Sequence, residues 1–209
     1  MAGLCSVASS HAPAFVRLAV AGRLRAVWIA EDVRARVRSR AEADPEFREH
    51  GARRHRWRLA PPVSEAAVAG LERKHRCELP LSYRTFLTTV SGGGAGPAYG
   101  LYEFGSVRWL DWQEDLDLLS VPFPHTEPFL PSPEHPVCTE HAPGEEDFSP
   151  CWFTGSLVLA EIGCGSFYRL VVTGSARGQV WTDDLGCGHT LSPGPDFRDW
   201  YTQWLNRSF

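Results

Sequence analysis

The residues whose types could do chemistry are gathered in the second half of the chain. Cys138 and His141 stand three apart, with His135 and Cys151 nearby, and all four are residue types that bind zinc. Zinc sites usually show two close pairs of ligands, and the second pair is missing here. We interpret these residues as incidental thiols and surface imidazoles, with a zinc site as the open alternative.

A thiol nucleophile and an acidic dyad are the two catalytic alternatives. Cys187 and His189 are two apart and would share one face of a strand. A nucleophilic thiol needs a lowered pKa and an oriented base, and the local sequence supplies neither. Cys164 lies between two glycines, which favours a buried structural cysteine in a tight turn.

Asp183 and Asp184 would point to opposite faces of a strand. We expect them to accept backbone N–H bonds at a turn, or to form a rim that contacts a partner.

A glycine-rich loop at residues 92–97 invites comparison with phosphate-binding loops. It lacks the Lys-Ser/Thr pair of a P-loop, and it follows a helical pattern instead of a strand. We therefore interpret it as a turn that ends a helix. No stretch matches a base-reading nucleic-acid module.

Charge is distributed unevenly along the chain. Residues 1–56 carry eleven Arg, no Lys and six carboxylates, for a charge of +5, whereas residues 57–209 carry −9. Between Arg108 and Arg169 there is no Lys or Arg, but there are eleven carboxylates. A surface that carries only negative charge steers basic partners toward itself and repels nucleic acid. The alternative is a solvated acidic loop that only aids solubility.

This acidic region is the candidate protein-binding surface. Exposed tryptophan is costly unless a partner uses it, so Trp109, Trp112 and Trp152 are candidate anchors. The alternative is that they pin the loop to the body. With the carboxylates and the strand-end pair, the full candidate set is Trp109, Asp111, Trp112, Glu114, Asp115, Asp117, Glu145, Glu146, Asp147, Trp152, Asp183 and Asp184.

A sheet must position these residues. Residues 156–184 contain three apolar runs separated by glycine-bearing turns, which predicts an antiparallel meander. A helix over residues 196–206 places five apolar residues, four of them aromatic, on one face. Helices are also predicted from Glu65 to near His75, behind a Ser64 N-cap, and through residues 79–90. The class is therefore α+β, an antiparallel sheet flanked by helices.

The remaining segments are less regular. Residues 14–40 predict one long helix, or two broken near Gly22, and residues 46–49 predict a short helix. We expect this helical extension, residues 1–56, to pack on the body. Residues 99–104 and 107–110 favour a hairpin of two strands. The acidic, proline-rich residues 111–150 predict a long excursion with little regular structure, whose Phe123 and Phe129 return to the body.

The chain has the composition of an ordinary globule, with 43% hydrophobic residues. We expect no signal peptide and no membrane span. The six cysteines are widely spaced, which is typical of buried thiols in a reducing cytoplasm. We expect a monomer in the free state.

Two parts of the chain resemble the SUKH superfamily, the Smi/Knr-like proteins. Residues 61–104 resemble its N-terminal half and residues 157–205 its C-terminal half. The matching positions are Leu79-Pro80, Tyr83, Phe86-Leu87, the loop from Gly93 to Pro97, Tyr99-Gly100-Leu101, Gly163-Cys164-Gly165, Val180-Trp181, Asp183 and Trp200-Tyr201. Ser91 and Leu185 depart from the usual pattern.

This resemblance implies a SUKH-like domain over residues 57–209 and no shared catalytic set, cofactor or metal. Bacterial members are mostly immunity proteins that bind and block a toxin, often a basic nuclease domain. Fungal members are scaffolds that regulate cell-wall synthesis and morphogenesis. The resemblance therefore implies a non-catalytic protein-binding domain, an immunity protein against a basic toxin, with a regulatory scaffold as the alternative.

Overall fold

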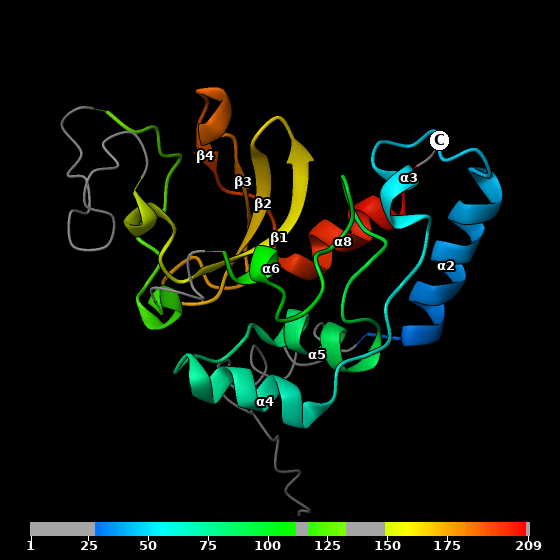
Figure 1. The fold of residues 1–209 in the computed structure, drawn as a ribbon, viewed down its shortest axis with the longest axis horizontal. Helices are drawn as coiled ribbons and strands as arrows, with labels where there is room; N and C mark the ends of the chain where they lie inside the picture. Colours follow the sequence, from blue (N-terminus) through cyan, green and yellow to red (C-terminus); the bar gives the residue numbers. More distant parts are fainter. Residues whose placement is uncertain (1–27, 112–116, 133–148, 208–209) are drawn as a thin grey trace, which may run out of the picture.

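The computed structural model describes residues 28–111, 117–132 and 149–207 of the chain. Its sheet has four antiparallel strands in chain order, β1-β2-β3-β4 (Figure 1). The strands are β1 (Ser156–Gly163), β2 (Ser166–Val171), β3 (Val180–Asp183) and β4 (Leu191–Ser192). The predicted meander is confirmed as β1 to β3, and the short β4 extends it. The α+β class is confirmed as well.

The turn between β1 and β2 has only two residues, because Gly163 pairs with Ser166. Cys164 and Gly165 both have positive φ, 53° and 81°, as a type I′ hairpin turn requires. Glycine adopts this conformation freely, whereas a residue with a Cβ is strained there by about 1 kcal/mol. Cys164 is exposed, so the prediction of a buried cysteine was wrong. A two-residue hairpin turn extends beyond the packed layers.

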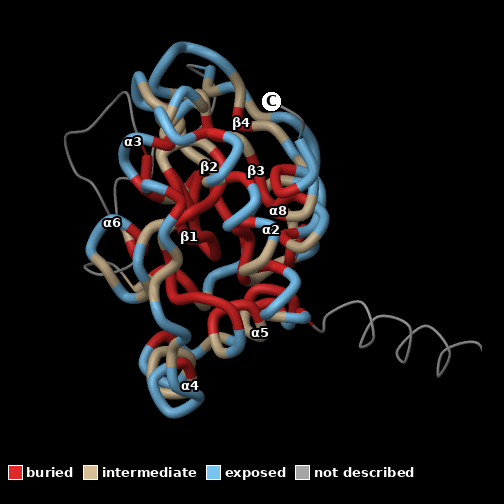
Figure 2. Tube along the Cα trace, turned by 90° about the vertical axis from the view of Figure 1, so that its right-hand side faces the viewer, coloured by how far each residue is buried: buried red, intermediate tan, exposed pale blue. Residues whose placement is uncertain are grey.

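The sheet is covered on both faces, because alternate residues of each strand point to opposite sides. Leu157, Leu159 and Leu170 face the helices. Val171, Trp181 and Leu191 face a second cluster, formed with Phe123, Trp152 and Phe153 of the acidic segment. Figure 2 shows the buried positions concentrated in the strands and in α5 and α8.

Three predicted helices are confirmed. They are α4 (Glu65–Lys74), α5 (Leu81–Thr89) and α8 (Phe197–Leu205). The Ser64 hydroxyl accepts the Ala67 amide of α4 at 3.2 Å. The Asp196 carboxylate accepts the Arg198 amide of α8 at 2.8 Å. Each side chain satisfies an amide that the first helical turn leaves without a partner.

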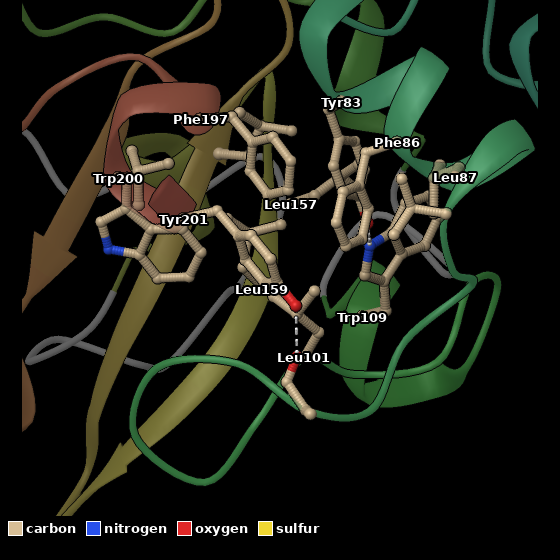
Figure 3. Close-up of a cluster of buried hydrophobic side chains, with 14 of the residues drawn as sticks. Tyr83, Phe86, Leu87, Leu101, Trp109, Leu157, Leu159, Phe197, Trp200 and Tyr201 are labelled. Atoms are coloured by element: carbon tan, nitrogen blue, oxygen red, sulfur yellow. Dashed lines mark hydrogen bonds between the residues drawn. The ribbon is translucent and has the colours of Figure 1, made fainter. Parts of the chain in front are cut away.

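The aromatic face of α8 packs into the centre of the core, as predicted (Figure 3). The Phe197 ring lies edge-on to Tyr83 with centroids 4.7 Å apart, and Tyr201 lies edge-on to Phe86 at 4.8 Å. The Tyr201 hydroxyl donates to the Ala95 carbonyl at 2.8 Å. Edge-to-face packing of this kind adds to the free energy gained by burial alone.

The described part of the N-terminal extension, residues 28–56, packs on the body through α2 (Ala30–Ala43) and α3 (Ala52–His55). The Trp28 indole donates to the Ser82 carbonyl at 2.7 Å. The Arg40 guanidinium lies 5.2 Å from the ring centres of both Trp57 and Trp204. The part of the predicted first helix before residue 28 lies outside the described residues.

Two local predictions were wrong. Residues 46–49 form no helix, because the Asp44 carboxylate instead accepts the Arg48 and Glu49 amides in a turn. Val107–Leu110 is the helix α6, not a strand. The Ser106 hydroxyl caps it by accepting the Trp109 amide at 3.3 Å, and a run of four residues with three apolar members does not distinguish strand from helix.

The segment from Tyr99 to Phe104 runs beside β1 without forming a regular strand. Its Tyr102 amide donates to the Leu159 carbonyl at 2.7 Å, and its Tyr99 amide donates to Glu161 at 3.1 Å. The predicted hairpin is therefore absent from this part of the structure. The acidic segment contains one described turn of 3-10 helix, η1 (Leu118–Ser120), and η2 (Pro150–Phe153) leads into β1.

Candidate protein-binding surface

A buried ion cluster joins the acidic segment to the sheet. Arg169 of β2 donates from Nε to Asp183 of β3 at 2.7 Å and from Nη1 to Asp111 at 2.9 Å. Its guanidinium also lies 3.8 Å from the ring centre of Phe153. Arg169 and Asp183 are 3% and 2% exposed. Two carboxylates surround one guanidinium, so the cluster carries a formal charge of −1.

The sheet register explains this pairing. Arg169 lies opposite Trp181 and Asp183 lies opposite Phe167, so Arg169 and Asp183 are diagonal neighbours on one face. The other Asp183 oxygen accepts the Leu185 amide at 3.2 Å. This contact confirms the predicted turn role of Asp183. Its burial contradicts the alternative that Asp183 lies on an exposed rim.

Asp117 fastens the acidic segment to the end of α4. Its two carboxylate oxygens contact His75 Nδ1 at 2.9 Å and Arg76 Nη2 at 2.7 Å. Asp111 and Asp117 were predicted to be free steering charges. Both are ion-paired, so each contributes to the attachment of the segment and less to the field outside the molecule.

The two described tryptophans of the candidate set are buried, which contradicts the prediction of exposed anchors. Trp109 has no exposed surface, and its indole donates to the Tyr83 hydroxyl at 2.8 Å (Figure 3). Burial raises the pKa of Tyr83 well above its usual value. Trp152 lies in the second core cluster beside Phe129, with ring centres 5.6 Å apart. The alternative interpretation, that these rings pin the segment, fits both.

The other candidates divide into two groups. Trp112, Glu114, Asp115, Glu145, Glu146 and Asp147 lie outside the described residues. Asp184 is partly exposed, and Glu127, which lies in the same acidic stretch of the sequence, is exposed. Among the residues that the structure describes, neither of these two carboxylates has an ion-pair partner. They therefore carry charge that no described ion pair offsets.

A charged cleft of about 330 Å³ opens between α6 and the β1–β2 pair, and its lining includes Asp111, Arg169, Tyr102, Arg108 and Glu161. Arg54 approaches Glu161 to 2.9 Å and Arg108 to 3.8 Å. Burial raises the pKa of the Tyr102 hydroxyl. Charges of both signs line this cleft, so it suits a polar side chain of a partner better than an apolar ligand.

The basic residues gather at the other end of the long axis. Figure 1 shows α2 and α3 at one end and residues 117–132 and 149–155 at the other. Arg53, Arg56 and Arg58 are exposed around α3. Among the described residues, these exposed arginines therefore lie away from the acidic segment.

The catalytic and metal alternatives gain no support from the described residues. There the Cys187 thiol contacts the Cys164 carbonyl at 2.7 Å and the Ser166 hydroxyl at 3.5 Å, with no contact recorded to His189. The described part of the chain contains no group of three or more potential metal ligands.

Cys151 is disulfide-bonded, to a partner outside the described residues. It is therefore not a free thiolate for zinc. We expected all six cysteines to be free thiols, and this was wrong for Cys151. The cysteines therefore no longer support the prediction of a reducing cytoplasm, which stays a prediction. Cys138 and His141 lie outside the described residues.

The glycine-rich loop after α5 is a structural turn. The Gly92 amide donates to Pro61 at 2.9 Å, the Gly94 amide to Leu101 at 2.9 Å and the Ala95 amide to Arg58 at 2.7 Å. Amides already bonded to the chain cannot form a cradle for phosphate.

Comparison with known families matches residues 62–203 to the model of the SMI1 / KNR4 family (SUKH-1). The match spans both halves of the resemblance noted in the sequence. No curated protein and no solved structure shows a match. In the parts that the structure describes, no helix is long and apolar enough to cross a membrane.

Proposed function

From the premise that this chain belongs to the SMI1 / KNR4 family (SUKH-1), we propose that it is a protein-binding domain with no reaction of its own. Its partner is a bacterial toxin domain, which it blocks by occupying the toxin's surface. We place this action in the cytoplasm, by a monomer. The partner is basic, and neither nucleic acid nor a membrane is a target.

The observation that carries the proposal is the acidic region between Arg108 and Arg169, which contains no Lys or Arg. Its described part covers one face of the sheet at one end of the molecule, away from the arginines of α3 (Figure 1). A basic surface approaching the chain is attracted to this end and repelled by the other. Such steering raises the association rate and sets the orientation of docking.

The residues have two different roles in this proposal. Trp109, Trp152, Asp111, Asp117 and Asp183 hold the segment on the body through buried rings and ion pairs. The steering charges are Asp184 and the carboxylates Glu114, Asp115, Glu145, Glu146 and Asp147, and Trp112 is the anchor that contacts the partner.

The test compares two variants of equal charge change against the toxin encoded beside this gene. The first neutralises Glu114, Asp115, Glu145 and Glu146. It spares Asp111 and Asp117, whose loss would also destabilise the fold. The control neutralises Glu31, Asp32, Glu42 and Glu46 at the basic end.

We expect the first variant to associate about tenfold more slowly and with a weaker salt dependence, and the control to associate at the native rate or faster. Equal rates for both variants would contradict the electrostatic proposal. A gene with no toxin beside it would favour the regulatory scaffold of cell-wall or morphogenesis signalling.

A further inference from the structure

Cys164 and Cys187 lie on two loops that meet at one end of the sheet. Cys164 is in the β1–β2 turn, and Cys187 ends the short 3-10 helix η3 (Leu185–Cys187), which follows β3. The Cys187 sulfur donates to the Cys164 carbonyl oxygen at 2.7 Å. Both cysteines are free thiols and both are exposed to solvent.

The backbone holds the two loops together independently of the sulfurs. A Cβ placed on Gly186 would lie 2.7 Å from the Gly165 carbonyl oxygen, closer than real contacts allow. Only glycine lets η3 approach the turn this closely. The two cysteines are each next to one of these glycines, so the approach of the backbones brings the two cysteine residues together.

The contact distance bounds the separation of the two Cα atoms. A carbonyl oxygen lies about 2.4 Å from its own Cα, and a cysteine sulfur about 2.8 Å from its own. With the 2.7 Å contact, the Cα atoms of Cys164 and Cys187 cannot be more than about 8 Å apart, and any bend of this path shortens the distance. Disulfides span roughly 4.4–6.8 Å between Cα atoms.

Cys164 also occupies a costly position. Its φ of 53° lies in the left-handed region, at a turn position that glycine or asparagine fills without strain. Strain of this kind is often retained where the side chain has a task. This turn places the backbone of Cys164 against η3, where the Cys187 sulfur contacts its carbonyl oxygen.

We infer that Cys164 and Cys187 are a paired dithiol that closes to an intramolecular disulfide by exchange with a low-molecular-weight disulfide such as glutathione disulfide. The disulfide ties the β1–β2 turn to η3. This inference concerns the chemistry of the chain itself and stands apart from the proposed toxin partner.

The exchange has two balanced steps. The Cys187 thiolate attacks one sulfur of glutathione disulfide, whose S–S bond breaks and releases one glutathione thiolate. The Cys164 thiolate then attacks the Cys187 sulfur of this mixed disulfide and releases the second glutathione. Two protein thiols are oxidised, one glutathione disulfide is reduced to two thiols, and the two protons end on glutathione.

The chain contains its own matched control, Cys77. This thiol is half-buried, and burial together with the neighbouring Glu72 raises its pKa to about 11. Exchange requires the thiolate, so Cys77 reacts slowly at neutral pH. Among the described residues, no other cysteine forms a hydrogen bond with Cys77. Oxidation that does not depend on exposure or on the thiolate would also consume Cys77, whereas exchange at the two exposed cysteines would leave it intact.

The experiment equilibrates the full chain in glutathione buffers of increasing oxidised fraction, followed by acid quench, alkylation and peptide mapping. Cleavage after Glu161, Arg169 and Arg177 places the two cysteines on separate peptides. Only a disulfide can join these peptides. Cys164→Ser and Cys187→Ser variants are treated in parallel.

We expect one joined peptide pair, loss of both thiols from alkylation together, and retention of the Cys77 thiol. The oxidised chain should melt about 5–10 °C higher than the reduced chain, since the new link closes a loop in the unfolded state. Each single variant should stop at a glutathione adduct, with no shift in melting temperature. Separate glutathione adducts on Cys164 and Cys187 in the native chain, unreacted thiols, or pairing of either with another cysteine would overturn the inference.

Discussion

Replacing Asp183 by Asn tests whether the buried ion cluster holds the acidic segment in place. The change keeps the size of the side chain but removes the carboxylate that accepts from Arg169 Nε at 2.7 Å. A buried hydrogen bond to a charged group contributes about 1.5–3 kcal/mol to stability. Asp111 still pairs with Arg169, so no charge is left without compensation, and we expect a loss at the upper end of this range, about 3 kcal/mol of unfolding free energy, because Asp183 is buried.

Urea unfolding followed by tryptophan fluorescence measures this loss directly. For a chain of this size, 3 kcal/mol corresponds to a fall of about 1 M in the midpoint. The matched control is Asp184→Asn, which removes the same charge one residue away, where the described structure shows no ion pair. We expect the control to change stability by less than about 0.5 kcal/mol. Equal midpoints for the two variants would refute the assignment of Asp183 to the scaffold.

Two further predictions concern the packing of the body. Burial lowers the pKa of His55 from 6.5 to about 4, so below pH 6.5 the unfolded chain takes up a proton that the folded chain does not. Stability should fall by about 2 kcal/mol between pH 6.5 and 4 in a series of urea titrations, after allowance for the part of the ring that solvent screens. A His55→Gln variant with the same acid slope would contradict this. Trp109→Phe removes the indole that donates to Tyr83 and should cost about 2–3 kcal/mol, since a buried hydroxyl loses its partner and a cavity remains. A loss below 1 kcal/mol in urea unfolding would show that the ring does not pin the segment.

Elements with a strong local pattern could be predicted from the sequence. The meander follows from β-branched runs between glycine turns, and α8 follows from its aromatic residues at helical spacing. The helix α6 could not be predicted, because its three apolar residues in a run of four fit either periodicity and the cap by Ser106 decided the outcome. The exposure of Cys164 depended on the turn type, which the sequence Gly-Cys-Gly did not specify.

The candidate surface was only partly predictable, because its key contacts join distant residues. Arg169 and Asp111 are 58 positions apart, and their pairing depends on how the acidic segment folds over the sheet. A signal was present in the sequence. Arg169 is the first Lys or Arg after Arg108, and it stands in an apolar strand. A lone charge in such a strand predicts a buried partner, since an isolated buried charge is prohibitively costly.

The location of the partner on this chain is tested most directly by a hydrogen-exchange footprint of the complex with the adjacent toxin domain. Our account predicts slower exchange in residues 117–132, at the acidic end, and unchanged exchange in α2 and α3. Protection confined to α2 and α3, with the acidic end unaffected, would contradict it.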